Sequence, residues 1–126
     1  MKKYAIPFLA VAVIGAGLFF LITTPDKPGE LDAFTACLKD KEAIFYGAFW
    51  CPNCANQKAM FGRSMKKLPY IECSTPDGNS QLQACKDKGI TAYPTWDFAD
   101  GERVTGTIPL DYLSEKTGCE LPIPTQ

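Results

Sequence analysis

The pattern of apolar and polar positions divides the chain into a continuous apolar segment and a region of mixed character. Residues 4–22 contain no charged side chain, and nineteen helical residues span about 28 Å, close to the hydrocarbon thickness of a bilayer. A polar stretch with two prolines and a glycine follows at 23–29, which is typical of a linker. We therefore predict a membrane anchor or uncleaved signal over 1–22, a linker over 23–29, a folded domain over 30–120 and a C-terminal tail over 121–126.

The charges that flank the apolar segment predict its orientation. Lys2 and Lys3 precede it, and cationic residues favour the cytoplasmic side of a membrane. We expect a single-pass protein of the cell membrane with a cytoplasmic N-terminus and an extracytoplasmic domain. A cleaved signal peptide is the alternative, although its apolar region usually runs for about 7 to 15 residues, and no A-x-A-like cleavage site follows this segment.

Within the domain, the periodicity predicts the order helix, strand, helix, strand, helix, strand, strand, helix. Apolar residues recur at helical spacing early in the domain, and a continuous apolar run after them indicates a strand buried on both faces. We expect an α/β fold in which strands joined by helices run parallel and a terminal hairpin adds an antiparallel edge. The predicted helices cover 30–41, 52–68, 80–89 and 109–118, and the predicted strands cover 43–50, 69–73, 92–98 and 102–107.

Charge and composition narrow the classes of function. The formal net charge is −1, and the absence of a basic stripe argues against nucleic acid as a partner. The chain has no histidine, which excludes Cys₂His₂ zinc sites and Cys–His catalytic pairs. All six cysteines lie in the predicted domain, a density that is typical of small exported domains in compartments where disulfides persist.

Cys51 and Cys54 stand where the buried strand meets the next helix. The N-terminus of a helix favours negative charge, so a cysteine there is stabilised as the thiolate. We expect Cys51 to occupy an exposed first position and Cys54 to lie one turn inside, shielded from outside attack. The pair then supplies the attacking thiol and the resolving thiol that disulfide exchange requires.

The motif FWCPNC, followed about 40 residues later by Tyr93-Pro94-Thr95 and then a hairpin, resembles the thioredoxin-like superfamily. The stretches FYGAFWCPNCANQKAMFG, LPYIECS, ACKDKGI and YPTW are similar to the thioredoxin-like domains that accompany bacterial vitamin K epoxide reductase homologues. The resemblance covers residues 31–119. It implies a compact thioredoxin-like α/β fold with a central mixed sheet, and a CxxC pair that exchanges disulfides with exported cysteine-containing proteins.

The same resemblance implies how the pair is supported. A quinone-linked membrane oxidoreductase related to vitamin K epoxide reductase would reoxidise the dithiol, with no metal or organic cofactor in this chain. The Tyr93–Pro94 bond would be cis and lie beside the CxxC motif, a bond type that is accessible at X-Pro. An extended substrate segment would then pair with the Tyr93 backbone. We expect the substrate surface to comprise Trp50, Pro52, Asn53, Tyr93 and Pro94.

Two positions depart from the family pattern. Asn53 stands where the family most often has histidine, and Phe45 stands where thioredoxins proper carry a buried acid. The proton acceptor for Cys54 is then Glu72 or water, and the sequence leaves this open. We predict a potential above thioredoxin's, about −270 mV, and below that of the strongest oxidant, about −120 mV. We expect the protein to oxidise exported proteins or to rearrange their disulfides. The alternative is a reductant of the cytochrome c maturation type.

The four remaining cysteines form two candidate pairs. Cys73 and Cys85 flank the STPDGN loop, and related domains carry this bridge, which would add about 3 kcal/mol on the chain-entropy model. Cys37 and Cys119 are either a further bridge or two buried thiols.

Two alternatives to the enzyme are a Cys₄ zinc site and a domain with an inert Cys51–Cys54 bridge.

Aromatic and basic residues near the motif have simpler interpretations. We expect Phe49 and Trp96 to pack in the core, and Lys58 to lie on a solvated helix face.

Overall fold

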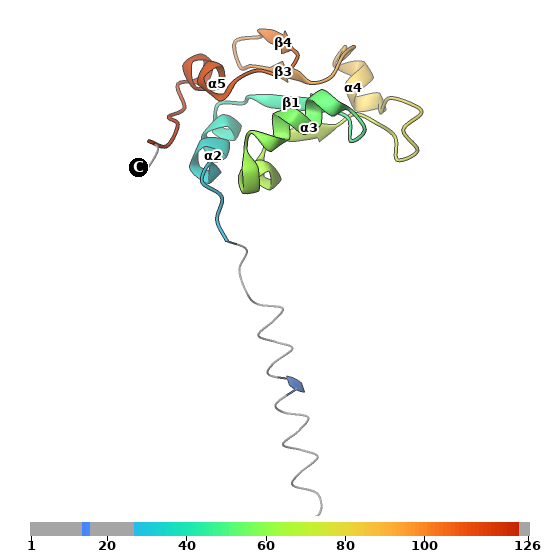
Figure 1. The fold of residues 1–126 in the computed structure, drawn as a ribbon. Helices are drawn as coiled ribbons and strands as arrows, with labels where there is room; N and C mark the ends of the chain where they lie inside the picture. Colours follow the sequence, from blue (N-terminus) through green and yellow to red (C-terminus); the bar gives the residue numbers. More distant parts are fainter. Residues whose placement is uncertain (1–13, 16–26, 124–126) are drawn as a thin grey trace, which may run out of the picture.

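The computed structural model describes residues 14–15 and 27–123 of the chain (Figure 1). The order of elements agrees with the prediction, with a 3₁₀ helix added after the second helix. They are α2 (Asp32–Asp40), β1 (Ile44–Gly47), α3 (Pro52–Ala59), the 3₁₀ helix η1 (Gly62–Lys67), β2 (Tyr70–Glu72), α4 (Gln83–Asp87), β3 (Thr95–Asp97), β4 (Arg103–Thr105) and α5 (Leu110–Thr117).

Within residues 14–15 and 27–123, no helix has the length and apolar character needed to cross a membrane. Apart from residues 14 and 15, the anchor predicted over 1–22 lies outside the described residues, as does the linker up to residue 26. Both therefore stay predictions.

The strands form one mixed sheet in the order β2-β1-β3-β4. β1 pairs in parallel with β2, as expected for two strands joined by a helix. β3, however, runs antiparallel to β1, so the parallel direction that we predicted for it is wrong. Because β2 runs parallel to β1, β3 begins at the end of the sheet where β2 ends, and the connection through α4 does not return along the sheet.

β1 is shorter than the continuous apolar run at residues 43–50. The predicted strand over 43–50 is confirmed only for Ile44–Gly47, because the chain turns at Ala48, whose carbonyl accepts a hydrogen bond from the Cys51 N–H at 3.1 Å. The prediction that Phe49 packs in the core is wrong, since 58% of it is exposed on this turn.

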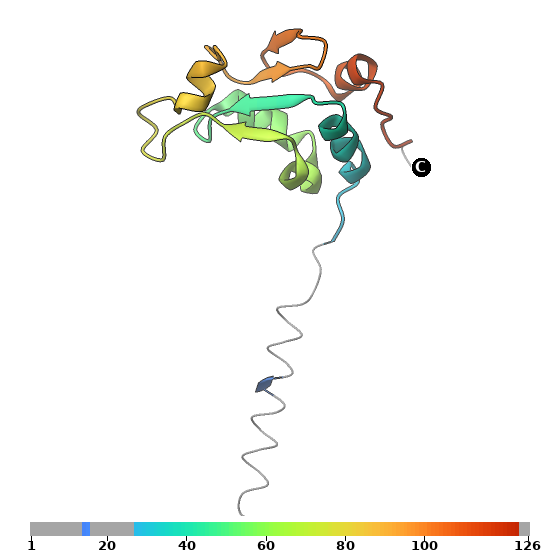
Figure 2. The same ribbon diagram turned by 180° about the vertical axis from the view of Figure 1, so that it is seen from behind.

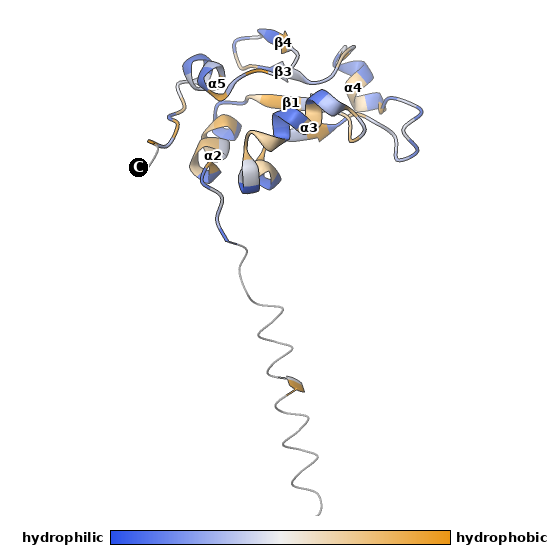
Figure 3. Ribbon diagram, in the orientation of Figure 1, coloured by the Kyte–Doolittle hydropathy of each residue, from blue (hydrophilic) through white to orange (hydrophobic). Residues whose placement is uncertain are grey.

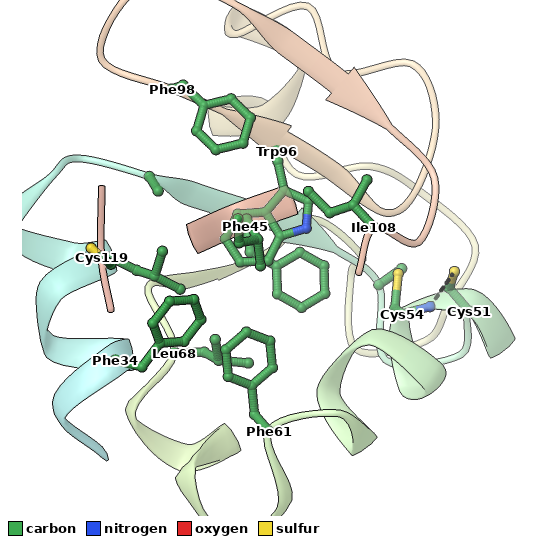
Figure 4. Packing of buried hydrophobic residues seen from close by; sticks show 14 residues of the cluster. Phe34, Phe45, Cys51, Cys54, Phe61, Leu68, Trp96, Phe98, Ile108 and Cys119 are labelled. Atoms are coloured by element: carbon green, nitrogen blue, oxygen red, sulfur yellow. Dashed lines mark hydrogen bonds between the residues drawn. The ribbon is translucent and has the colours of Figure 1, made fainter. Parts of the chain in front are cut away.

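The sheet separates two buried clusters because strand side chains alternate between its faces. Phe45 lies on the face covered by α2, α3 and α5, where it stacks on Trp96 with 5.0 Å between ring centroids (Figure 4). Trp96 is fully buried, as predicted. Tyr46 points to the opposite face, where the shorter α4 covers a smaller cluster, and Figure 2 shows that side of the sheet.

The long helix predicted over 52–68 is divided in two. α3 stops at Ala59, and Gly62 takes a left-handed φ of +52° that interrupts the helix before η1. Phe61 and Leu68 are buried, whereas Met60 and Met65 are exposed. Figure 3 shows the polar outer face of α3 above the apolar β1.

Two disulfides tie these elements together. Cys37 on α2 is joined to Cys119, just beyond α5, with an S–S distance of 2.06 Å. Cys73, at the end of β2, is joined to Cys85 on α4 at 2.01 Å. These are the two candidate pairs of the sequence analysis.

Candidate active site

Cys51 caps the N-terminus of α3. Its Sγ accepts the backbone N–H of Cys54 at 3.3 Å, and Pro52 begins the helix, where its missing N–H costs nothing. The Cys51 thiol also donates to the Tyr93 carbonyl at 3.7 Å. Only 6% of Cys51 is exposed, so the expectation of an exposed position is wrong: the Tyr93 segment lies against its sulfur.

Cys54 lies behind Cys51 on the face of α3 that meets β1 (Figure 4). It is 1% exposed, and both cysteines are free thiols. Burial raises the pKa of Cys54 to about 12, its side-chain hydrogen bond to Cys51 adds to this rise, and the charge of Lys58 opposes it. Cys54 is therefore a protonated thiol at neutral pH, and it must lose a proton before it can attack a disulfide.

The Tyr93–Pro94 peptide bond is cis and brings the Tyr93 carbonyl beside Cys51. Trp50 meets Tyr93 edge to face at 5.9 Å between centroids, and its indole N–H donates to Ser74 Oγ at 2.8 Å. Half of Trp50 is exposed, and it borders a surface groove that Tyr93, Ile90 and the 78–81 loop also line.

The remaining predicted substrate residues lie on the same side of the domain. Pro52 and Asn53 are exposed in the first turn of α3, and the Asn53 carbonyl accepts a hydrogen bond from Thr107 Oγ1 at 3.2 Å. Pro94 is buried behind Tyr93. The structure thus places Trp50, Pro52, Asn53 and Tyr93 around Cys51, with Pro94 beneath them.

A polar group that the sequence analysis did not assemble stands behind Cys54. Glu72 accepts three hydrogen bonds: one from the Tyr70 hydroxyl at 2.7 Å, and two from the backbone N–H groups of Phe49 at 3.2 Å and Ser74 at 2.9 Å. Lys58 Nζ lies 3.5 Å from the centroid of the Tyr70 ring, so the prediction that Lys58 lies on a solvated face is wrong.

Sequence spacing contained a signal for this group. Tyr70 and Glu72 are two positions apart on a strand, and Cys54 and Lys58 are four positions apart on a helix; both spacings place two side chains on one face. The spacing does not show that this face of the strand meets this face of the helix. Phe45 packs between Tyr70 and Trp96.

Gln57 holds α3 in place from the side opposite to solvent. It is fully buried; its amide nitrogen donates to the Ile108 carbonyl at 3.0 Å and its oxygen accepts the Ile108 N–H at 2.8 Å. Trp96 Nε1 donates to the same oxygen at 3.4 Å. This cross-link was missed by the sequence analysis, which read position 57 only as part of a helix.

The disulfides remove ligands that the alternative Cys₄ zinc site would need. Cys73 and Cys85 are joined as a disulfide, and a closed zinc site requires deprotonated thiolates. Cys51 and Cys54 remain as a dithiol pair with no further cysteine thiol available to them, since the other two cysteines of the chain are also bridged.

The strand order, the helices on both faces and the cis peptide bond beside a CxxC pair give the chain a thioredoxin-like α/β fold. The fold and the site together define a thioredoxin-like domain with a free dithiol at the start of its active-site helix.

No protein-family model matches the chain. It is 46% identical over 84 residues to a protein of Arabidopsis thaliana named thiol-disulfide oxidoreductase LTO1. The match covers 63% of this chain and 22% of that protein, so the chain spans about a fifth of the length of this relative. Among solved structures, a thioredoxin of Malassezia sympodialis covers 76% of this chain and 96% of its own, with 17% identity and a TM-score of 0.42.

Proposed function

We propose that the chain is a protein thiol–disulfide oxidoreductase in which Cys51 exchanges disulfides with a substrate and Cys54 resolves the intermediate. The observation that carries the proposal is the pairing of Cys51 at the helix N-terminus with the cis Tyr93–Pro94 bond. An extended substrate pairs with the backbone of Tyr93 and presents its sulfur to Cys51.

The exchange balances without a cofactor. In the oxidising direction, a substrate thiolate attacks Cys51 Sγ, the Cys51–Cys54 bond breaks, and Cys54 leaves with the electron pair and takes up a proton. A second substrate thiolate then attacks its partner sulfur in the mixed disulfide, and Cys51 leaves as the thiolate. The substrate gains a disulfide, and the CxxC pair gains two electrons and, at Cys54, one proton, with Cys51 left as the thiolate.

The similarity to a thiol-disulfide oxidoreductase at 46% identity supports this activity. Because the matched region is 22% of that protein, the activity, substrates and partners of this chain are part of the proposal. We propose exported cysteine-containing proteins as substrates and a quinone-linked enzyme, related to vitamin K epoxide reductase, as the oxidant that regenerates the disulfide.

We further propose that the domain acts outside the cytoplasm, tethered by the apolar segment at residues 4–22. Two disulfides away from the CxxC pair, Cys37–Cys119 and Cys73–Cys85, support an oxidising compartment, because such bridges are rare where glutathione keeps thiols reduced.

Two measurements test the function. In cells, Cys54→Ser should accumulate mixed disulfides through Cys51, whereas Cys51→Ser should accumulate none; the reverse result would exchange the two roles. In vitro, equilibration of the wild-type chain with glutathione should give a potential between about −270 and −120 mV. A value at or below thioredoxin's would favour the reductant instead, and a chain that exchanges with neither substrate nor glutathione would exclude the activity.

A further inference from the structure

The resolving step needs a proton acceptor for Cys54, and the structure offers a specific one. Two atoms converge above Gly47, where the absence of a side chain leaves room on the β1 surface. A Cβ placed on Gly47 would lie 2.8 Å from Tyr70 Cε2, 3.0 Å from Cys54 Sγ and 3.4 Å from the Tyr70 hydroxyl oxygen. The resolving sulfur and the hydroxyl edge of the Tyr70 ring therefore lie close together over Gly47.

The Tyr70 hydroxyl leads onward to a carboxylate. It donates to Glu72 Oε2 at 2.7 Å, while Glu72 Oε1 is held by the backbone N–H groups of Phe49 and Ser74. Three donors fix the carboxylate of Glu72, which leaves Oε2 aimed at Tyr70. Tyr70 is thus hydrogen-bonded to Glu72 on one side and lies near the Cys54 sulfur on the other.

We propose, on the basis of the function proposed above, that Tyr70 and Glu72 form the proton relay of Cys54. When Cys54 resolves a mixed disulfide, its S–H proton moves to the Tyr70 oxygen as the Tyr70 proton moves to Glu72 Oε2. The freed electron pair of Cys54 forms the bond to Cys51 Sγ, and the substrate sulfur leaves as a thiolate that takes a proton from solvent. In the oxidising direction the same relay returns a proton to Cys54 as it leaves.

The charged and titratable groups around Cys54 fit this role. α3 contributes Cys51 and Lys58, β2 contributes Tyr70 and Glu72, and β1 contributes the apolar Phe45 and Gly47. Lys58 lies over the Tyr70 ring, where its charge favours the Cys54 thiolate once the proton has left. Burial and the Glu72 hydrogen bond raise the pKa of Tyr70 far above its usual value, so Tyr70 passes a proton on without staying ionised.

The Tyr70 ring is held in place by Phe45 of β1. The two rings meet edge to face with 5.0 Å between centroids. This aromatic contact keeps Tyr70 over Gly47, so Phe45 supports the position of Tyr70 near Cys54.

The test separates the relay from the function on which it depends. The reduced full chain, purified in detergent, is mixed with the aromatic disulfide dithiobis(nitrobenzoate) in a stopped-flow instrument. Attack by Cys51 releases one coloured thiolate in a first phase, and resolution by Cys54 releases a second. The absence of a first phase would contradict the proposed function, whereas the second phase reports on the relay alone.

The variants are Tyr70→Phe and Glu72→Gln. Phenylalanine keeps the ring, and glutamine keeps an oxygen for the two backbone N–H groups at Oε1. Tyr112→Phe is the matched control, because the hydroxyl of the half-buried Tyr112 on α5 also donates to a glutamate, Glu102 at 3.2 Å, through a solvent-exposed hydrogen bond.

We expect both relay variants to slow the second phase by about ten- to a hundredfold near neutral pH, with the first phase unchanged. Their second-phase rates should also rise about tenfold for each pH unit, as for removal of the proton by hydroxide, while the wild-type and Tyr112→Phe rates vary much less with pH. Loss of packing alone would not produce this change of slope.

An unchanged second phase and pH slope in both variants, with the first phase intact, would overturn the relay. An effect of Glu72→Gln without one of Tyr70→Phe would also overturn it, since Glu72 would then act without the tyrosine.

Discussion

At the residue scale, two cysteines only three positions apart have different surroundings. Cys51 lies at the end of α3 with its sulfur between the Cys54 N–H and the Tyr93 carbonyl. Cys54 faces β1, where Gly47 allows its sulfur to approach the strand. Burial favours the neutral form of the Cys54 thiol, whereas Cys51 lies at the helix N-terminus beside the segment that we propose binds the substrate. Their chemical roles follow from this difference.

The raised pKa of Cys54 predicts an alkaline loss of stability in the reduced domain. Since burial, followed by the Cys51 hydrogen bond, raises this pKa from 9.0 to about 12, the unfolded chain releases the proton at lower pH than the folded chain. The contribution of the neutral thiol is therefore complete below pH 9 and is lost as the pH rises toward about 12.

Urea unfolding of the reduced chain at increasing pH measures this effect, with reduced Cys54→Ser as the control. The free energy of unfolding should fall more steeply above pH 9 for the wild type than for Cys54→Ser. Tyr70 keeps its burial and its Glu72 hydrogen bond, the two largest causes of its raised pKa, in both proteins, so most of its titration cancels in the comparison. Parallel curves for the two proteins would show that Cys54 titrates alike in the folded and unfolded chain.

At the element scale, α3 has few apolar contacts with which to hold its orientation. It has eight residues, and only Cys54 and Gln57 among them are buried. Gln57 compensates by bonding both backbone groups of Ile108 and the Trp96 indole. The helix that carries the dithiol is thereby fixed to β3 and to the segment that enters α5.

Replacing Gln57 with leucine should therefore destabilise the domain by about 2–4 kcal/mol. The substitution leaves the N–H and carbonyl of Ile108 and the Trp96 N–H buried without partners, and each costs about 1–3 kcal/mol, less any rearrangement. Urea denaturation of the oxidised chain gives the value.

The matched control is Gln83→Leu, because the Gln83 amide bonds only to Asp87 on the exposed side of α4. We expect a change within about 0.5 kcal/mol for this control. Equal effects of the two substitutions would mean that the buried amide of Gln57 contributes no more than a surface one.

At the scale of the whole molecule, two disulfides support a small domain with two unequal buried clusters. The larger cluster lies under α2, α3 and α5, and the smaller one lies on the opposite face with Cys73 and Cys85 at its centre. The Cys37–Cys119 bridge joins the first and last elements of the domain across 82 positions, whereas Cys73–Cys85 spans 12.

Removal of the longer bridge should cost more stability. On the chain-entropy model, Cys37→Ser with Cys119→Ser should lose about 4–5 kcal/mol, and Cys73→Ser with Cys85→Ser about 3 kcal/mol. Urea unfolding of the three oxidised proteins gives the order. A greater loss from the shorter bridge would mean that packing of the smaller cluster, and not loop entropy, sets its contribution.

Local sequence was sufficient for several elements. The apolar period of α2, the left-handed Gly118 that ends α5 and the glycine turn between β3 and β4 depend on residues close together in the chain. The position of Cys51 at a helix N-terminus was predictable for the same reason, since a buried strand followed by Cys-Pro marks the start of a helix.

Contacts between distant segments decided what local sequence left open. The antiparallel direction of β3 depends on the end of the sheet at which the connection through α4 rejoins it. The exposure of Phe49 depends on the residue at which β1 stops pairing. The approach of Tyr70 to Cys54 requires β2 to lie beside Gly47 and α3 to cross above it. Periodicity assigns a residue to a face of its own element, but the residues that meet across two faces are set by the packing of the whole chain.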